Sequence, residues 1–495
     1  MVGQFQASFM NQTNFWKNQL SRFSLLTVMG LFSLHAVNAS SRPNFIFIYT
    51  DDQRWDILSV VQRELGAKGR FPWLKTPNMD RIANEGVRFR NAFAVNSLCA
   101  PSRATFLTGQ YGFDNGVVNN HTPFPLNNVT HASLLRAAGY RTAYVGKWHM
   151  GQQVERPGFD FTASFLGQGK YFDCPIYVKG QSTPSTGWVD DVTTDYALKF
   201  IRENQDRPFL MVIGYKATHG PFTPPPRREE DYEGEQARAV PNLQAQAVYR
   251  KENQDQATPE TSALAKVNLG YFRCVTAADD NVGRVLSLLD ELKLAENTVV
   301  VFAGDNGYYL GEHRLGDKRT AYDESLRIPL LLRYPKLGVK GRVVDEMVLN
   351  TDLAPTFVDL AGLSVPPQMH GRSWRPLLGG KPTDWRKAFF YCYFFERGFG
   401  SPMTTAVRTD TAKLIRYPGH GEWTELFDLK QDPHELKNLI NVPAAAALRQ
   451  RMEAEYERQK AAIGFQVPDY ADQPGAVTGT EVTKKGARGK KKKAG

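Results

Sequence analysis

The sequence predicts an α/β fold built on a large, mostly parallel sheet that helices cover on both faces. Three runs of strand length carry the prediction, and each is apolar almost throughout: residues 44–50, 209–215 and 298–304. Continuous apolar runs are typical of strands buried on both faces. Helical patterns lie between them: Thr76-Pro77 begins one, residues 133–138 form another before Gly139, and residues 263–292 carry apolar residues at helical spacing. Strands that alternate with helices in this way favour parallel pairing.

A second, smaller unit is expected after residues 374–387, a stretch rich in glycine, proline and basic residues. Short strand-like runs follow at 388–395 and 413–417. We therefore expect a main domain over residues 43–383 and a C-terminal subdomain over residues 386–466. Residues 467–495 are polar and basic, and we expect them to form a disordered tail.

The N-terminus differs in composition from the rest of the chain. Residues 1–39 contain no acidic residue and only Lys17 and Arg22 as basic residues, residues 23–36 are largely apolar, and Val37-Asn38-Ala39 offers a small-residue cleavage site. This arrangement predicts a secretory signal peptide over residues 1–39, with a retained N-terminal anchor as the alternative. Because the apolar run is short for a membrane span, we expect a secreted or periplasmic protein without a stable membrane span.

The formal net charge of +10 is concentrated at the ends of the chain. Seven basic residues lie between Lys484 and Lys493, and two lie in the leader, so the remainder is nearly neutral. A basic tail can contact nucleic acid or an anionic polysaccharide, but such runs are usually solvated ends, and we expect no nucleic-acid partner. The four cysteines show no metal-site spacing with histidine and are too few for a disulfide scaffold.

Polar pairs follow two of the predicted strands. Asp51-Asp52 comes directly after residues 44–50, and Asp305-Asn306 directly after residues 298–304. In parallel sheets, ligands collect beyond the carboxyl ends of the strands. Each pair alone would fit a turn or a helix cap. Together, however, they supply the oxygen ligands that a hard divalent cation prefers, and adjacent carboxylates need such a positive charge between them.

Cys99 lies where a strand-like run, residues 87–94, gives way to a short helix-forming segment. Pro101 suits the first turn of a helix, where its missing N–H has no cost. Unpaired amides and the positive end of the helix dipole favour anions at this place. Arg103, one turn later, can lie on the same face. Cys99 is therefore a candidate nucleophile, with a small buried thiol as the alternative.

Two long motifs resemble the sulfatase family, a branch of the alkaline phosphatase superfamily. The first is C-x-P-S-R-x-x-x-L-T-G over residues 99–109, and the second is G-Y-R-T-A-Y-V-G-K-W-H over residues 139–149. The resemblance extends from about Pro43 to about Leu439. It implies an alkaline phosphatase-like catalytic domain and a C-terminal subdomain consisting of a small antiparallel sheet with one helix.

The resemblance also implies the composition of the site. Cys99 would be converted to formylglycine, an aldehyde, by a formylglycine-generating maturase during synthesis. Residue 99 would share one divalent cation with Asp51, Asp52, Asp305 and Asn306. Calcium is the expected ion and magnesium the alternative, because both prefer oxygen ligands.

Basic and imidazole side chains at matching family positions complete the implied catalytic set. Arg103, Lys147 and Lys318 suit the stabilisation of negative charge on the sulfonyl oxygens. His149 and His219 suit proton transfer, since imidazole titrates near neutral pH. Each of these residues alone would be read as a surface lysine or a satisfied histidine. The matching positions favour the catalytic interpretation.

The substrate is indicated less specifically. Residues 116–120, 317–319 and 324–330 look like those of N-acetylglucosamine-6-sulfatases, which implies a sulfated carbohydrate as partner. His313 and His370 are candidate substrate contacts. Two alternatives stay open: a phosphonate or phosphate ester hydrolase of the same superfamily, and an inactive homologue that only binds sulfated glycan.

Overall fold

The three apolar runs form the centre of a ten-stranded sheet in the computed structural model, which describes residues 42–151, 154–250, 266–380 and 384–471. Strand β1 (Asn44–Thr50) lies between β9 (Thr298–Gly304) and β8 (Phe209–Gly214) and is parallel to both. Parallel pairing continues from β8 to β4 (Arg141–Lys147) and β5 (Phe161–Phe165). The expected large, mostly parallel sheet is confirmed.

The outer strands are mixed in direction. The strand order is β13-β2-β12-β9-β1-β8-β4-β5-β6-β7, and the antiparallel pairs involve β12, β6 and β7. The strands not yet introduced are β2 (Val87–Phe89), β6 (Ile176–Val178), β7 (Gln181–Thr183), β12 (Leu330–Arg333) and β13 (Arg342–Val344).

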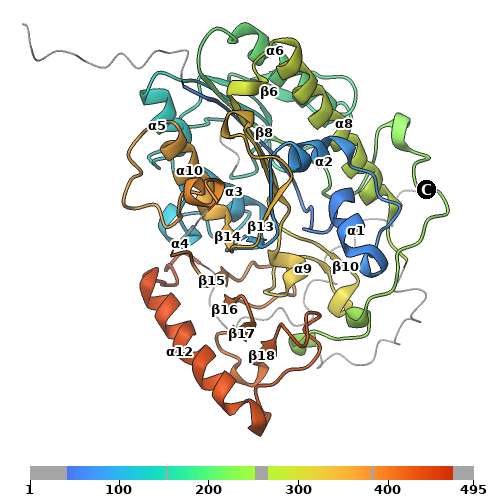
Figure 1. The fold of residues 1–495 in the computed structure, drawn as a ribbon, viewed down its shortest axis with the longest axis vertical. Coiled ribbons are helices and arrows are strands. Elements are labelled where there is room, and N and C mark those ends of the chain that lie inside the picture. The colour runs from blue at the N-terminus through green and yellow to red at the C-terminus, as the bar shows by residue number, and fades with distance from the viewer. Residues whose placement is uncertain (1–41, 152–153, 251–265, 381–383, 472–495) are drawn as a thin grey trace, which may run out of the picture. The chain divides into compact units, whose positions relative to one another are not determined.

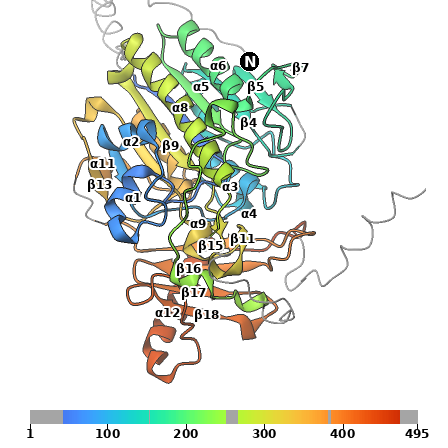
Figure 2. The same cartoon turned by 90° about the vertical axis from the view of Figure 1, so that its right-hand side faces the viewer.

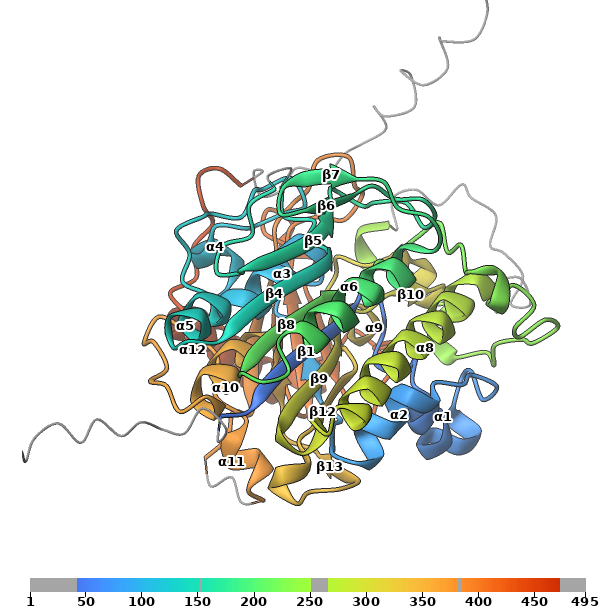
Figure 3. The ribbon, with the colours of Figure 1, turned by 90° about the horizontal axis from the view of Figure 1, so that it is seen from above.

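Helices cover both faces of the sheet because the central strands are apolar on both faces. In β1, Ile46 and Ile48 belong to one buried cluster, whereas Phe45 and Phe47 belong to another, as the two-residue period of a strand requires. The helices on the first face are α1 (Ser59–Leu65), α2 (Pro77–Asn84), α6 (Val189–Glu203) and α8 (Leu269–Glu291). Those on the second are α3 (Cys99–Thr108), α5 (His131–Ala137) and α10 (Leu353–Leu360). Figure 3 shows the two groups on opposite sides of the strands.

The helix starts predicted from the sequence lie within a few residues of the observed ones. Helix α2 begins at Pro77, and α5 begins two residues before Ser133 because Thr130 caps it. The first residues of the expected helix 263–292 fall outside the described residues, and α8 begins at Leu269 with Asn268 as its cap. The strand-like run 87–94 holds two strands in different sheets: β2, and β3 (Ala92–Phe93), which pairs with β14 (Val348–Leu349).

The C-terminal region forms the expected antiparallel sheet with one helix. Its strands are β15 (Ala388–Tyr393), β16 (Thr404–Thr409), β17 (Ala412–Arg416) and β18 (Glu425–Asp428). Helix α12 (Ala446–Ala462) lies against β15, β16 and β17, as Figures 1 and 2 show. The remaining short elements are α4 (Gly112–Asn115), α9 (Asp323–Leu326), α11 (Arg375–Leu378), β10 (Tyr309–Leu310) and β11 (Gly316–Asp317).

Two expectations fall partly or wholly outside the described residues. The signal peptide expected over residues 1–39 lies entirely outside them. Of the tail expected over residues 467–495, residues 467–471 are described, and Ala471 is buried. In the part of the chain that the structure describes, every helix is too short or too polar to cross a membrane. All four cysteines are free and buried.

Candidate active site and metal centre

The candidate residues converge where four neighbouring parallel strands end. Asp51-Asp52 follows β1, Asp305-Asn306 follows β9, and the segment that ends in His219 follows β8. Lys147 is the last residue of β4. Because β9, β1, β8 and β4 are adjacent and parallel, their carboxyl ends lie at the same edge of the sheet.

Three buried carboxylates form the centre of the site. Oxygen atoms of Asp51, Asp52 and Asp305 lie within 4.8 Å of one another. The backbone N–H of Asp52 donates to Asp305 Oδ1 over 3.0 Å, and Asn306 Nδ2 donates to Asp52 Oδ1 over 2.7 Å. Burial and the charge of Asp51 raise the pKa of Asp305 to about 7. Such crowding of acidic groups is relieved when a cation binds among them.

The donor set fits a hard divalent cation. Asn306 Oδ1 is buried without a hydrogen-bond partner among the described residues, although the same amide donates through Nδ2. A buried carbonyl oxygen without a donor is costly in water-free surroundings, and a metal ion would satisfy it. Asp51, Cys99 and His219 form a second group of possible ligands within 4.8 Å of one another. The described residues thus provide ligands for an ion next to residue 99.

Cys99 is the first residue of α3 and is completely buried. Its Sγ lies 3.2 Å from Asp51 Oδ1. Burial, together with the charge of Asp51, raises the pKa of the Cys99 thiol well above its usual range. An unmodified thiol here would therefore remain protonated and would be a poor nucleophile near neutral pH.

Arg103 connects two of the carboxylates to α3. Its Nε donates to Asp305 Oδ2 over 2.9 Å, and its Nη2 donates to Asp51 Oδ2 over 3.1 Å. Its Nη1 donates to the backbone oxygen of Lys147 over 2.6 Å. The guanidinium also lies 4.8 Å from the ring centre of Tyr49. The planar guanidinium of Arg103 therefore fixes the side chains that follow β1 and β9 relative to the backbone at the end of β4.

Two buried lysines also pair with these carboxylates. Lys147 Nζ donates to Asp51 Oδ2, and Lys318 Nζ donates to both oxygens of Asp52 over 2.6 and 2.7 Å. Burial alone would raise the pKa of Asp51, but Lys147 and Arg103 hold it well below its usual value. Burial alone would lower the pKa of Lys318, but Asp52 raises it well above its usual value. Three cations thus balance three carboxylates.

The two histidines border this cluster. His219 Nε2 lies 3.9 Å from Asp52 Oδ2, and Nδ1 lies 2.9 Å from the backbone oxygen of Gly220. Burial and Lys147 lower the pKa of His219 to about 4. His149 is buried, and burial and Lys147 lower its pKa as well. Both rings are therefore neutral near pH 7 before an anion binds.

Sequence reasoning missed two residues beside the lysines. Gln168 accepts from Lys147 through Oε1 and from Lys216 Nζ through its backbone oxygen, the latter over 2.9 Å. Lys216 is buried, and burial and Lys147 lower its pKa to about 8. Its place in Tyr215-Lys216-Ala217-Thr218-His219, directly after a buried strand, was a usable signal. Gln168 lies in a loop after β5, and no local pattern marks it.

The two candidate substrate histidines are placed differently from the other residues. His370 donates its backbone N–H to the oxygen of Gly109, at the end of α3 opposite Cys99, which puts it about 15 Å along the helix. Its Nδ1 accepts the backbone N–H of Tyr111 over 3.1 Å, and its Nε2 lies 3.2 Å from Asp114 Oδ2. His313 is 2% exposed and stacks on Tyr322 with 4.0 Å between ring centres. In this structure the packing of both rings is accounted for by protein neighbours.

Comparison with known proteins identifies the family. The sequence matches the sulfatase family over residues 43–363, and the C-terminal region of N-sulphoglucosamine sulphohydrolase over residues 311–462. The chain therefore belongs to the sulfatase family and is a sulfuric ester hydrolase.

Its relatives include enzymes of carbohydrate metabolism. An N-acetylglucosamine-6-O-sulfatase of Bacteroides thetaiotaomicron is 34% identical over 81% of this chain and 83% of that protein. An ulvan-active sulfatase of Formosa agariphila is 30% identical over 87% of this chain and 84% of that protein. A structure solved with its substrate D-glucosamine-2-N,6-O-disulfate superposes with a TM-score of 0.78 at 30% identity, over 87% of this chain and 99% of that one.

Proposed function

We propose that this sulfatase removes a sulfate ester from a glucosamine-type sugar, at the 6-O position, with residue 99 as nucleophile. The observation that carries the proposal is the closed cluster of three buried carboxylates and three buried cations around residue 99. The choice of sugar is supported by the similarity to an N-acetylglucosamine-6-O-sulfatase and to a structure solved with a sulfated glucosamine.

The charge balance of the cluster explains how it would attract a sulfate ester. Without an ion, Arg103, Lys147 and Lys318 match Asp51, Asp52 and Asp305 in formal charge. A divalent cation held by Asp51, Asp52, Asp305 and Asn306 would leave the site with a positive surplus. That surplus, in a buried place with few competing water molecules, favours an anionic substrate. We expect calcium, with magnesium as the alternative.

Conversion of Cys99 to formylglycine is part of the proposal. The hydrated aldehyde would supply an attacking hydroxyl, and the cation would act as a Lewis acid beside it. The raised pKa of the Cys99 thiol supports a need for this conversion, because the unmodified side chain would stay protonated. The partner implied is a formylglycine-generating maturase.

The remaining roles follow from position. Arg103, Lys147 and Lys318 stabilise negative charge on the sulfonyl oxygens. His219 donates a proton to the leaving sugar oxygen, because its Nε2 faces the carboxylates while Nδ1 is held near Gly220. A bound sulfate anion raises the pKa of His219 from its low starting value, which makes the ring a proton donor only when substrate is present. His149 takes up a proton from residue 99 when sulfate leaves.

The reaction test compares paired substrates with one protein preparation. Purified protein whose residue 99 has been checked by mass spectrometry is assayed on N-acetylglucosamine-6-sulfate and on the matching phosphate ester. We expect sulfate release, a much slower phosphate reaction, and no turnover for Cys99→Ala. A faster phosphate or phosphonate reaction would instead assign the chain to the phosphoester-cleaving branch of the superfamily. Binding of the sulfated sugar without turnover by fully converted protein would favour a glycan-binding role.

We also propose that the protein is exported to the periplasm or the medium, on the leader-like composition of residues 1–39. N-terminal sequencing of protein recovered from its own host tests this, with a mature end soon after Ala39 as the expected result. Full-length protein in the cytoplasm would contradict it.

A further inference from the structure

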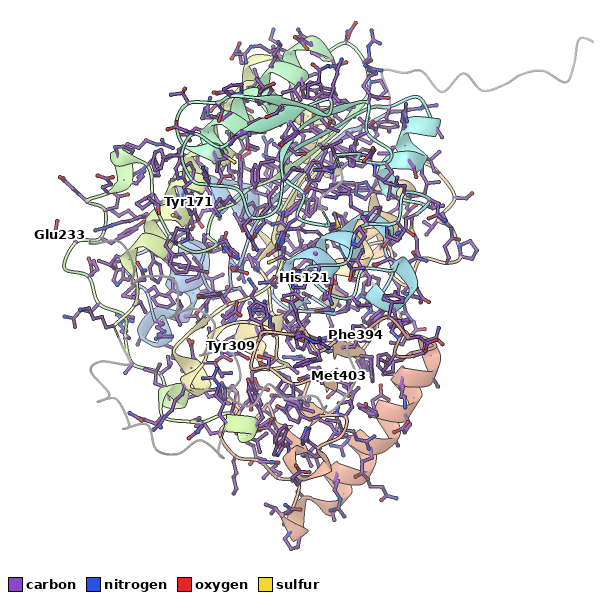
Figure 4. The ribbon with its side chains drawn as sticks, turned by 180° about the vertical axis from the view of Figure 1, so that it is seen from behind. His121, Tyr171, Glu233, Tyr309, Phe394 and Met403 are labelled. Atoms are coloured by element: carbon purple, nitrogen blue, oxygen red, sulfur yellow. The ribbon has the colours of Figure 1, made fainter. Side chains whose placement is uncertain are left out.

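The C-terminal sheet packs directly on the segment that leads into Cys99. Leu98, Tyr309, Phe394 and Met403 belong to one buried cluster together with the apolar residues of β15–β18, and Figure 4 labels the last three. The backbone N–H of Cys392 in β15 donates to the oxygen of Val95 over 3.0 Å. The backbone entering the nucleophile helix therefore rests on the C-terminal sheet.

Glu396, just beyond β15, extends this contact into the site. Its side chain is completely buried. Oxygen Oε2 accepts from the backbone N–H of Asn120 over 3.1 Å, and Oε1 accepts from Arg319 Nη2 over 3.2 Å. A buried carboxylate is costly unless it is paired and hydrogen-bonded. Glu396 is both, so its position is tightly determined.

Each partner of Glu396 leads to a residue of the site within one further contact. Asn120 Oδ1 accepts the backbone N–H of Ala100, the residue after Cys99, over 3.0 Å. Arg319 follows Lys318, whose Nζ donates to both oxygens of Asp52. The same carboxylate is thus linked to the first turn of α3 on one side and to the lysine that pairs with Asp52 on the other.

Other contacts restrict Arg319 without reaching α3. Its Nη1 donates to Asp317, and its guanidinium lies 3.5 Å from the ring centre of Phe399. Only Glu396, among these neighbours, also bonds the Asn120 backbone. A glutamine at this position keeps one acceptor oxygen and turns the other into a donor NH2 group, so it can accept from only one of Asn120 and Arg319, and less strongly than a carboxylate does.

We propose that Glu396 is a positioning residue that sets the distance between residue 99 and Lys318 from the C-terminal sheet. This inference rests on the proposed role of residue 99 as nucleophile. The C-terminal subdomain would then contribute to the chemical step, because it holds the attacking group at residue 99 and Lys318 at the correct distance from each other. A misplacement of reacting groups by about 1 Å can lower the rate about 10²-fold.

The test compares Glu396→Gln with Glu425→Gln. Glu425 is a matched control because it is buried in β18 and accepts from the hydroxyls of Tyr322 and Tyr417. Residue 99 conversion is first measured by mass spectrometry, so that rates refer to converted protein. For E396Q we expect kcat to fall about tenfold or more with KM changed less than threefold, a loss of about 1.4 kcal/mol in the transition state. For E425Q we expect unchanged kcat at a similar loss of thermal stability.

Two further variants separate positioning from a merely structural role. Glu396→Asp restores the charge, and part of the lost kcat should return. Asn120→Ala should lower kcat, and the double variant E396Q/N120A should lose less than the product of the two single effects, because both act through one chain of contacts. Equal kcat in E396Q and E425Q, or full additivity with N120A, would overturn the proposal.

A measurement that needs no substrate tests the positioning role of Glu396 separately from the proposed sulfatase activity. Backbone amide exchange of Ala100 should quicken in E396Q and remain unchanged in E425Q, because Asn120, which accepts the Ala100 N–H, is held less strongly by a neutral amide than by the Glu396 carboxylate. Unchanged exchange at Ala100 would refute the proposal that Glu396 positions α3 through Asn120, whichever substrate the enzyme hydrolyses. Absence of sulfate release by fully converted wild type would refute the proposed function and leave the exchange result standing.

Discussion

Arg103→Lys should separate the charge of this residue from its geometry. Arginine donates from three nitrogens to Asp305, Asp51 and the Lys147 backbone, over 2.9, 3.1 and 2.6 Å. A lysine ammonium keeps the charge but can reach only part of this set from the same helix position. The substitution therefore removes part of the hydrogen bonding to Asp305, Asp51 and the Lys147 backbone while the formal charge of the site stays constant.

The magnitude follows from the bonds lost. A hydrogen bond to a charged group contributes about 1.5–3 kcal/mol, and two of the three should be lost in R103K, giving a decrease of about 3–6 kcal/mol in the free energy of unfolding. Loss of a fixed charge-stabilising donor also lowers kcat by about 10²–10³-fold. Urea unfolding at fixed calcium concentration measures the first effect, and turnover per converted residue 99 measures the second.

The control is Arg202→Lys, because Arg202 forms an exposed pair with Glu291 over 3.2 Å. We expect R202K to change the free energy of unfolding by less than about 0.5 kcal/mol. If R103K unfolds within about 1 kcal/mol of wild type and keeps its kcat, the reasoning that Arg103 joins the carboxylates in one network is refuted.

Three further predictions concern pH, metal and the leaving group. Burial raises the pKa of Asp279 from 3.8 to about 7, so the folded state holds this proton more tightly than the unfolded chain. The free energy of unfolding should then fall by up to about 1.4 kcal/mol per pH unit between about pH 4 and 7. Asp279→Asn should flatten this slope in urea titrations, and identical slopes would contradict the assignment. Asn306→Ala should require about tenfold more calcium for the same rise in Tm, about 1.4 kcal/mol of binding; an unchanged calcium dependence would exclude Asn306 as a ligand. His219→Ala should lower kcat about 10²–10⁴-fold on a sugar sulfate but much less on a nitrophenyl sulfate, whose leaving group needs no proton; equal losses would argue against His219 as the acid.

The central strands could be predicted from the sequence because their signal is local. A strand buried on both faces is apolar at nearly every position, as in residues 44–50 and 298–304, and its end is marked by the polar pair that follows. Parallel pairing of β1 with β9 then brings Asp51-Asp52 beside Asp305-Asn306 without further information. The metal-type cluster thus follows from strand prediction and elementary charge considerations.

Features that depend on tertiary contacts could not be predicted in this way. Residues 87–94 mix apolar residues with Arg88, Arg90 and Asn91, and this pattern does not show that β2 pairs in the main sheet whereas β3 pairs with β14. Gln168 and Glu396 act through bonds to residues far away in the chain, and neither belongs to a repeating pattern. The stacking of the His313 ring on Tyr322 likewise depends on the whole fold.

Formylglycine at residue 99 is tested most directly by the mass of the tryptic peptide that contains this residue, taken from protein made in its own host. We expect the mass loss that follows when the thiol is replaced by an aldehyde, in a preparation that releases sulfate in proportion to the converted fraction. A peptide that carries an unmodified thiol in protein with full sulfatase activity would contradict it, because the buried Cys99 thiol would then have to act as the nucleophile itself.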